Sequence, residues 1–286
     1  MELYSPAKIN LYLQVTGKRP DGYHELVMLM TAISLYDRIS VETGADSNCV
    51  TCSHPGVPED DTNLALRAAK LFYDRAGIDG SVAIHLEKNI PVGAGLGGGS
   101  SNAATVLKGL NSHHNNLFSD QELMEMGSLL GSDVPFFILG KPARVEGRGE
   151  NVYLLENIVP YAVIVLFPGI SISTAAVYKK LNFGLTKNEK KTKSPLLNKG
   201  LVDPVNHLYN DLEQPALAIC SEINVLKGVL AIHGAEGVLM SGSGSSVFGL
   251  YSEMNTARKA YDKLKSYAAD HDGCGNWQMF LSEMIV

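Results

Sequence analysis

Apolar and polar residues alternate along several short stretches of this chain, and a period of two predicts β-strands. The alternation is clearest in residues 3–15, where it follows Pro6, and it returns in residues 38–42. Residues 161–167 are instead apolar without a break, which predicts a buried strand. The full set of predicted strands is 3–15, 38–42, 82–86, a hairpin over 143–156, 161–167, 236–240, 246–251 and 277–284.

Other stretches repeat their apolar residues at helical spacing. Residues 64–76 follow Thr62 and Asn63, either of which can cap a helix, and residues 119–122 have the sequence of a capping box. Strands and helices interleave without regular βαβ units and without an internal repeat, which predicts an α+β fold in two lobes. The predicted helices are 64–76, 102–110, 123–130, 210–232 and 255–269.

Composition and charge then exclude several classes of protein. Of the 286 residues, 45% are hydrophobic and 19% are charged, so the chain can build a sizeable core and is not expected to be disordered. The formal net charge of −6 disfavours a nucleic-acid binder, although a few local cations would suffice for a small phosphate-bearing ligand. No apolar run is long enough to span a membrane, and the first residues lack the pattern of a signal peptide. With four cysteines, we expect a cytoplasmic protein without a disulfide framework.

Two further stretches predict little chemistry. Cys49 and Cys52 form a single C-x-x-C pair, which we expect to be two small hydrophobic residues in a strand rather than a metal or redox site. Residues 187–199 are rich in lysine, and we expect them to form a solvated loop rather than an anion-binding segment.

The strongest chemical signal is a glycine-rich segment between a predicted strand and a predicted helix. Glycine lets the backbone approach a ligand and adopt positive φ, and the free N–H groups at the start of a helix attract anions. We therefore expect this segment to hold phosphate groups, and we expect Gly97→Val to obstruct them without unfolding the protein. The residues of the segment are Pro91, Val92, Gly93, Ala94, Gly95, Leu96, Gly97, Gly98, Gly99, Ser100 and Ser101.

Two common phosphate-binding motifs do not describe this segment. A Walker loop would need lysine where Gly99 stands. Residues 93–98 have the G-x-G-x-x-G spacing of a dinucleotide-binding fold, but they do not lie in a first βαβ unit, where that motif occurs. A glycine turn without a ligand is the simpler alternative. A second turn of small residues, 241–246, is either a plain hairpin or a second wall of the same site.

Phosphoryl transfer also needs a cation near the phosphates and a group that orients the attacking hydroxyl. Lys8 in the first predicted strand and Asp133 in the turn over residues 131–135 are candidates for these roles. Each has a structural alternative. Lys8 can be a solvent-facing residue of an edge strand, and Asp133 can be a helix N-cap.

Five segments together resemble one family of enzymes. In order and spacing they are similar to the 4-diphosphocytidyl-2-C-methyl-D-erythritol kinases, a family of the GHMP kinase superfamily. The glycine-rich segment is typical of the superfamily, whereas Pro-Ala-Lys-Ile-Asn-Leu and Asp-Gly-Tyr-His-Glu-Leu indicate this family. The likeness extends from about residue 4 to the end of the chain, and the five segments are residues 6–11, 21–26, 91–101, 131–137 and 242–245.

The resemblance implies two lobes. Residues 1–157 would form an N-terminal ATP-binding GHMP kinase domain like domain 2 of ribosomal protein S5, and residues 158–286 a ferredoxin-like C-terminal GHMP kinase domain. The implied reaction transfers the γ-phosphoryl group of ATP to the 2-hydroxyl of 4-diphosphocytidyl-2-C-methyl-D-erythritol, in the non-mevalonate pathway to isoprenoid precursors. Mg²⁺ would accompany ATP, carried mainly on the nucleotide, and no protein residue is predicted to ligate a metal. Neither a nucleic acid nor a membrane is expected as a partner.

The resemblance also assigns roles to single residues. Asp133 would be the base and Lys8 its catalytic partner, while residues 91–101 would wrap the ATP phosphates. The implied substrate contacts are Asn10 near the reacting hydroxyl, Tyr23 and His24 against the cytosine, and Tyr178 stacked on that ring.

Two rival interpretations differ from this one in the ligand they require. A homoserine or mevalonate kinase would share the glycine-rich segment, but its substrate has no nucleobase for the three aromatic residues to contact. An RNA-binding module with an S5-like lobe is disfavoured by the negative net charge. One position departs from the family pattern: Ala94 stands where glycine is common, so we expect a negative φ there.

Overall fold

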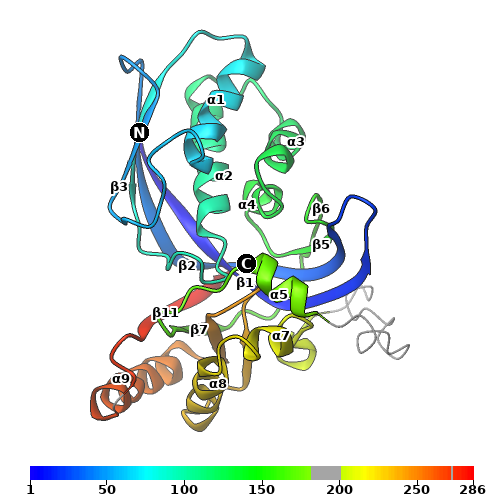
Figure 1. The fold of residues 1–286 in the computed structure, drawn as a ribbon, viewed down its shortest axis with the longest axis vertical. Helices are drawn as coiled ribbons and strands as arrows, with labels where there is room; N and C mark the ends of the chain where they lie inside the picture. Colours follow the sequence, from blue (N-terminus) through cyan, green and yellow to red (C-terminus); the bar gives the residue numbers. More distant parts are fainter. Residues whose placement is uncertain (182–200, 272) are drawn as a thin grey trace.

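The computed structural model describes residues 1–181, 201–271 and 273–286, which form two α+β parts one above the other in Figure 1. In the N-terminal part, helices α1–α4 lie on one side of the strands β1–β3. In the C-terminal part, α8 and α9 lie on the outer side of the sheet that contains β7 and β11. The prediction of an α+β fold in two lobes is confirmed.

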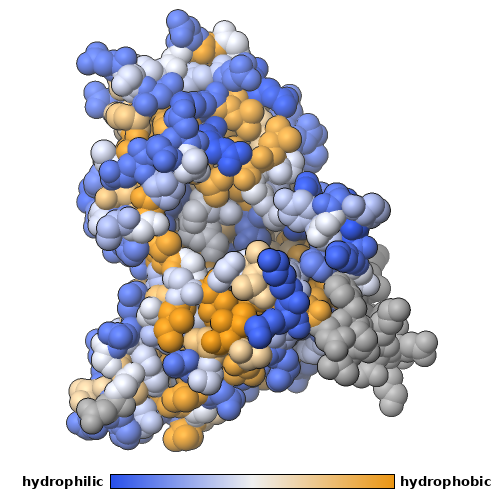
Figure 2. All heavy atoms as spheres, viewed as in Figure 1, coloured by the Kyte–Doolittle hydropathy of each residue, from blue (hydrophilic) through white to orange (hydrophobic). Residues whose placement is uncertain are grey.

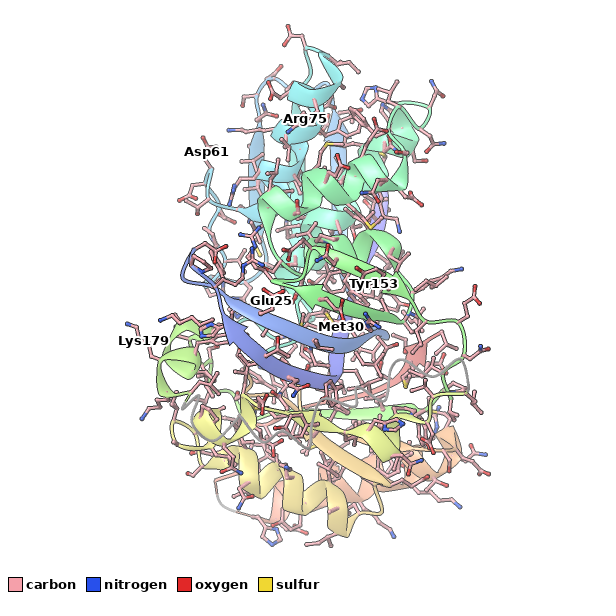
Figure 3. All side chains as sticks on the ribbon, turned by 90° about the vertical axis from the view of Figure 1, so that its right-hand side faces the viewer. Glu25, Met30, Asp61, Arg75, Tyr153 and Lys179 are labelled. Atoms are coloured by element: carbon pink, nitrogen blue, oxygen red, sulfur yellow. The ribbon has the colours of Figure 1, made fainter. Side chains whose placement is uncertain are left out.

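The longest strands form a hairpin that crosses the molecule. Strand β1 pairs with β2 in antiparallel register from Glu2 opposite Ser40 to Lys18 opposite His24, with three shifts of register along the way. Figure 3 shows this hairpin, with Glu25 near its tip, lying between the helices of the N-terminal part and those of the C-terminal part. The strands of the N-terminal part are β1 (Glu2–Lys18), β2 (His24–Thr43), β3 (Cys49–Cys52), β4 (Val82–Glu87), β5 (Ala143–Gly147) and β6 (Asn151–Leu154).

The helices of the N-terminal part begin where their sequences predict caps. The side chain of Asn63 accepts a hydrogen bond from the N–H of Ala65, and Ser119 and Glu122 form the complete capping box. Their apolar faces join the strands in one core that includes Phe72, Leu107 and Phe136. These helices are α1 (Leu64–Ala76), α2 (Gly98–His113), α3 (Asp120–Leu130) and α4 (Val134–Leu139).

The C-terminal part is a small antiparallel sheet covered by helices. Its strands are β7 (Ala162–Phe167), β9 (Gly237–Met240), β10 (Val247–Tyr251) and β11 (Gln278–Ile285), and the short β8 (Tyr209–Asn210) pairs with β1. Its helical elements are α5 (Thr174–Lys180), the 3₁₀ helix η3 (Pro204–His207), α7 (Glu213–Leu217), α8 (Glu222–Ile232) and α9 (Met254–Asp270).

The last strand connects the two parts. Strand β11 pairs with β7 through residues 278–283, and its end then pairs with β2, where Met284 lies opposite Ile33. The strand order is therefore continuous, β3-β4-β2-β11-β7-β10-β9, and the end of β11 lies beside β2. A boundary between domains near residue 157 stays a prediction.

Several predicted elements have different limits in the structure. Residues 26–35, which the alternation left unassigned, belong to β2, and residues 136–139 belong to α4. The single helix predicted over 210–232 is wrong, because the Asn210 side chain bonds to Met240, Gly242 and Leu212 and ends β8 in a turn before α7 begins. The lysine-rich stretch 187–199 lies outside the described residues. None of the described helices is long and apolar enough to cross a membrane.

Candidate active site

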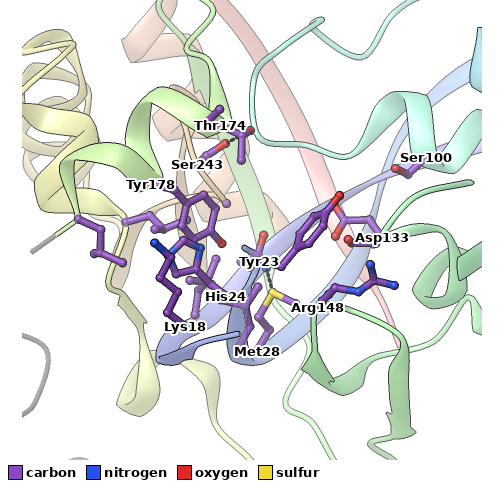
Figure 4. A pocket seen from close by; sticks show the side chains of 18 of the residues that line it. Lys18, Tyr23, His24, Met28, Ser100, Asp133, Arg148, Thr174, Tyr178 and Ser243 are labelled. Atoms are coloured by element: carbon purple, nitrogen blue, oxygen red, sulfur yellow. Dashed lines mark hydrogen bonds between the residues drawn. The ribbon is translucent and has the colours of Figure 1, made fainter. Parts of the chain in front are cut away.

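Two adjoining cavities lie between the two parts of the molecule. Figure 2 shows that this face is hollowed at the level between the two parts, and Figure 4 shows the larger cavity from close by. The volumes are about 930 Å³ and about 390 Å³. The two linings share Lys8, Ser100, Asp133 and Thr174, so these residues mark the junction of the cavities.

Lys8 lies in β1 with its ammonium group buried at this junction. Only 4% of the residue is exposed. Its Nζ donates to Asn10 Oδ1 and, over 3.0 Å, to the carbonyl of Gly95. Burial lowers the pKa of Lys8 from its usual value, and the nearby carboxylate of Asp133 opposes this shift. The alternative of a solvent-facing Lys8 is therefore wrong.

Asp133 faces Lys8 from the start of α4. Its Oδ2 lies 3.7 Å from Lys8 Nζ, and its side chain is 29% exposed, so it is accessible from the cavities. The residue is at the N-cap position of α4, but its side chain makes no capping hydrogen bond. The prediction that Asp133 is a helix N-cap is therefore correct for its position, but its side chain does not cap the helix. The carboxylate is left available for other chemistry. It is the only carboxylate among the described residues that line the two cavities.

The glycine-rich segment turns its carbonyl groups toward the protein. Leu96 O accepts from the backbone N–H of Lys8 over 3.0 Å, and Ala94 O accepts from that of Ser246 over 3.2 Å. Gly95 O accepts from the Lys8 ammonium and also from Ser241 Oγ. The carbonyl groups of the segment thus accept hydrogen bonds from both parts of the molecule, and these bonds hold the segment in place.

Its donors are left for a ligand. Helix α2 begins at Gly98, after Gly97 at a φ of +72°. The N–H groups of Gly98, Gly99 and Ser100 have no acceptor among the described residues, and all three residues line the smaller cavity. Unsatisfied N–H groups at the positive end of a 16-residue helix form an anion-binding site.

The conformation of the segment confirms one expectation and corrects another. Ala94 has the expected negative φ, since Asn115 and Asn116 are the non-glycine residues with positive φ in the described chain. Gly97 is a poor position for a probe, however. A Cβ there would lie 3.0 Å from Lys8 Cγ and 3.0 Å from the ring of Phe137, at a φ that disfavours valine. Gly97→Val would therefore disturb the protein itself, contrary to the expectation from sequence.

The second turn of small residues is a wall of the same site. It connects β9 and β10, and Gly242 and Ser243 line the larger cavity. A Cβ on Gly242, at a φ of +57°, would lie 3.1 Å from Lys8 Nζ and 3.0 Å from the carbonyl of Gly95. The turn is therefore a hairpin whose glycine allows close packing against the buried ammonium group.

A buried network holds both ends of the glycine-rich segment. Asp37 in β2 is fully buried and forms an ion pair with Lys88. Asn102 in α2 donates to Asp37 Oδ2 over 2.9 Å and accepts from Lys88 Nζ over 3.0 Å. Asp37 Oδ1 also accepts the N–H groups of Asn89 and Ile90, which precede the segment. Sequence reasoning missed this network, because a single aspartate in an alternating strand carries no signal of burial.

Aromatic side chains gather in the larger cavity, where Figure 4 shows Tyr23 next to Asp133 and the pair of His24 and Tyr178 farther from it. The rings of His24 and Tyr178 are stacked, with centroids 4.5 Å apart and 17° between their planes. The neighbouring Tyr23 is 54% exposed. Burial and the nearby Lys18 lower the pKa of His24, so its ring is neutral at pH 7. Burial raises the pKa of Tyr178, and the charge of Asp133 adds to this.

Further polar residues line the larger cavity, and of these only Ser243 belongs to a segment that the sequence connected with the site. Thr174 Oγ1 and Ser243 Oγ are hydrogen-bonded over 2.8 Å and join the start of α5 to the second glycine turn. Lys18 and Arg148 also line this cavity. Arg148 lies in the turn of the predicted β5–β6 hairpin, where the only signal was the Gly-Arg-Gly sequence, and this indicated a turn rather than a ligand.

The cysteines do not form a site. Cys49 and Cys52 lie in β3, as expected for two small residues of a strand, with Cys49 exposed and Cys52 half-buried. All four cysteines of the chain are free. The described part of the chain holds no group of three or more His, Cys, Asp or Glu residues that could bind a metal ion.

Comparison with known proteins identifies the class. The family model of the GHMP kinases N terminal domain matches residues 63–141, which contain the glycine-rich segment, and that of the GHMP kinases C terminal domain matches residues 197–270. A homoserine kinase from Cytophaga hutchinsonii has the same fold, with a TM-score of 0.72 at 17% identity over 100% of this chain and 94% of that one. The two family models and the fold are those of a GHMP kinase.

More similar proteins narrow the assignment. A protein of Syntrophotalea carbinolica named 4-diphosphocytidyl-2-C-methyl-D-erythritol kinase is 44% identical over 98% of both chains. One of Syntrophus aciditrophicus with the same name is 40% identical over 100% of this chain and 99% of that one. The crystal structure of a 4-(cytidine 5'-diphospho)-2C-methyl-D-erythritol kinase matches with a TM-score of 0.79 at 37% identity over 99% of each chain. This chain belongs to the 4-diphosphocytidyl-2-C-methyl-D-erythritol kinase family, as its motifs predicted.

Proposed function

We propose that this chain transfers the γ-phosphoryl group of ATP to the 2-hydroxyl of 4-diphosphocytidyl-2-C-methyl-D-erythritol, in the non-mevalonate pathway to isoprenoid precursors. The observation that carries the proposal is the Lys8–Asp133 pair at the junction of two cavities. One cavity is bordered by free N–H groups of a helix, which suit phosphates, and the other by aromatic rings, which suit a base. A donor in the first and an acceptor in the second would meet at that pair.

ATP binds in the smaller cavity in this proposal. Residues 91–101 wrap its phosphates, with the N–H groups at the start of α2 as donors. The ammonium group of Lys8 lies between this segment and Asp133, so it can stabilise the charge that develops on the transferred group.

Asp133 accepts the proton of the attacking hydroxyl. Its carboxylate makes no capping hydrogen bond that the reaction would have to break. It lies beside Lys8 at the junction of the two cavities, where the hydroxyl of the acceptor would meet the phosphoryl group. Lys8 holds the carboxylate and the incoming oxygen in place, because its Nζ is fixed by Asn10 and by the carbonyl of Gly95. Asn10 is itself buried beside the second glycine turn and contacts the substrate next to the reacting hydroxyl.

The cytosine binds at the aromatic end of the larger cavity. Tyr23 and Tyr178 offer ring faces for stacking, which contributes about 1–3 kcal/mol per base. One face of Tyr178 is covered by His24 in the structure, so His24 moves off that face when the base enters. A neutral imidazole carries one donor and one acceptor, so the ring of His24 has the chemistry to read the Watson–Crick edge of the base.

Mg²⁺ accompanies ATP in this proposal and is carried by the phosphates. The donor set supports this arrangement, because Asp133 is the single carboxylate among the described residues of the two cavities. When bound, the ion neutralises charge on the phosphate oxygens.

The free state of all four cysteines supports a cytoplasmic location, and the absence of a nucleic-acid partner stays a prediction.

An ATP-consumption assay with a panel of acceptors tests the proposal. We expect ADP release with 4-diphosphocytidyl-2-C-methyl-D-erythritol and none above background with homoserine or mevalonate. Detection of the product as a 2-phosphate by ³¹P NMR identifies the acceptor hydroxyl. Turnover of homoserine or mevalonate in preference to the cytidine compound would replace the proposal with one of the rival kinases.

A further inference from the structure

Arg148 lines the larger cavity next to Tyr23 and to the turn that carries Asp133. It lies in the turn between β5 and β6, and its guanidinium carbon is 5.1 Å from the centre of the Tyr23 ring. The next residue, Gly149, packs against the turn that carries Asp133, since a Cβ on it would lie 2.2 Å from Ser132 O. Figure 4 shows Arg148 beside Tyr23 and on the side toward Asp133. The side chain therefore lies beside the space that a ligand reaching from the aromatic rings to Asp133 would occupy.

The guanidinium group is available for a ligand. The backbone N–H of Arg148 donates a hydrogen bond to the Glu150 carboxylate. Its guanidinium group makes no hydrogen bond or ion pair with any of the described residues, and contacts the ring of Tyr23. By contrast, the Lys8 ammonium is committed to Asn10, Gly95 and Asp133. The carboxylate of Asp21 is near enough for the charge of Arg148 to lower its pKa, but it forms its ion pair with Arg19. A half-buried arginine outside any ion pair, on the wall of a cavity, is suited to bind an anionic group.

The substrate of the proposed function has an anionic group in the corresponding place. Its diphosphate separates the cytidine from the erythritol, so it must lie between the aromatic end of the cavity and Asp133. Resting on that function, we propose that Arg148 binds the diphosphate of the substrate through its guanidinium group, while its flat face packs on Tyr23. Arginine suits this task because its planar fork of N–H groups matches two phosphate oxygens at once.

Titration calorimetry with cytidine and cytidine 5'-diphosphate, without ATP, tests this role. The two ligands differ only in the diphosphate, so their affinity ratio reports the contact proposed for Arg148. In Arg148→Met we expect the diphosphate ligand to lose roughly 10–100-fold in affinity, as for a lost hydrogen bond to a charged group, and cytidine to lose no more than a few-fold. Arg148→Lys should retain part of the affinity, because it keeps the charge without the fork.

Arg144→Met is the matched control. Arg144 lies on the same hairpin, with its guanidinium carbon 5.2 Å from the centre of the Tyr153 ring, but it does not line the cavity. We expect it to leave the affinities for both ligands unchanged, and thermal unfolding checks that each variant is folded. An equal loss for both ligands in Arg148→Met, or no loss for either, would overturn the proposal while the proposed function stands. A wild-type protein that binds neither ligand would overturn both.

Discussion

The Lys8–Asp133 pair shows how surroundings determine what a side chain can do. Lysine is among the residues least often buried without a partner, and here its ammonium group is almost fully enclosed. Three oxygen atoms face it, from Asn10, Gly95 and Asp133. Only the last of these is charged, and it is also the most accessible to a ligand. The pair is therefore organised to act on a group that enters from the cavities.

Replacement of Asp133 by asparagine tests its role as the base. Asp133→Asn keeps the shape of the side chain and removes its ability to take a proton. We expect kcat to fall by roughly 10²–10⁴-fold, the usual contribution of a positioned general base, while the KM for ATP changes little. Steady-state kinetics measure both constants. A variant that retains most of the wild-type kcat would make Asp133 a structural residue of α4.

The pKa of Lys8 predicts the alkaline side of the pH profile. Burial lowers this pKa from 10.5, so the ammonium group loses its proton at a lower pH than a free lysine does. If the reaction needs the charged form, kcat falls about tenfold per pH unit above the Lys8 pKa, and this fall begins below pH 10.5. The same titration does not destabilise the fold there, because the unfolded chain binds more protons in that interval. Full activity up to pH 10.5 in a folded protein would contradict the role given to Lys8.

Single residues were the hardest part of the site to predict from the sequence. Nothing in a pattern of alternating residues distinguishes a buried Lys8 from an exposed one, and its identification depended on the resemblance to a family. The resemblance assigned no role to Asp37 or Arg148, and sequence reasoning missed both. Their importance arises from contacts across the chain, such as those of Asp37 with Lys88 and Asn102, which no local spacing reveals.

At the scale of elements, the start of α2 is the feature on which ATP binding depends. Gly99 is the sharpest probe of it, because the residue is exposed and a Cβ there would meet only Leu64 Cδ1, at 3.7 Å. We expect Gly99→Val to weaken ATP binding by on the order of tenfold or more, since its side chain displaces phosphates from the helix N–H groups. The measurement is ATP affinity by calorimetry, with thermal unfolding as the check on the fold.

Gly228→Val is the control for this change. Gly228 is an exposed glycine of α8, and a Cβ on it would have nothing within 4 Å. It does not line either cavity. It should leave ATP affinity unchanged. If Gly99→Val also binds ATP like the wild type, the phosphates do not lie on the start of α2.

The ion pair of Asp37 and Lys88 stabilises the elements that flank the glycine-rich segment. Both side chains are at most 4% exposed, so removing one charge leaves the other buried and unpaired. We expect Asp37→Asn to lower the free energy of unfolding by about 3–5 kcal/mol, as measured by urea denaturation. The double variant Asp37→Asn, Lys88→Met should lose less than the sum of the single variants. A loss below about 1 kcal/mol in Asp37→Asn would show that the pair is not isolated from water.

Elements were predictable where their signals are local. The cap at Asn63 and the capping box at Ser119 located α1 and α3 because both are made by residues close in sequence. The start of α2 was expected at Asn102, because glycine has a poor intrinsic preference for helix. It lies at Gly98, since the packing of the segment outweighs that preference. The break before α7 depends on contacts of Asn210 with the β9–β10 turn, which are distant in sequence.

At the scale of the whole molecule, the site exists because distant segments meet. It takes Lys8 from β1, Asp133 from the start of α4, the free N–H groups from α2 and Ser243 from the turn after β9. Strand β11 joins the two parts into one sheet order and so fixes the cavity between them. Two lobes could be predicted from the interleaving of elements, whereas no pattern along the chain indicates their arrangement around a shared cavity.

In the proposed function, the larger cavity binds the cytidine end of the phosphoryl acceptor. The most direct test compares kcat/KM for the cytidine substrate and its uridine analogue in the wild type and in His24→Ala. The analogue presents an acceptor where cytosine has a donor, which leaves a buried polar group unpaired at a cost of about 1–3 kcal/mol. We predict that the wild type prefers cytidine by about tenfold or more, that His24→Ala loses most of this preference, and that Tyr178→Ala weakens both substrates alike. Equal kcat/KM for the two substrates in the wild type, or an unchanged ratio in His24→Ala, would contradict the account.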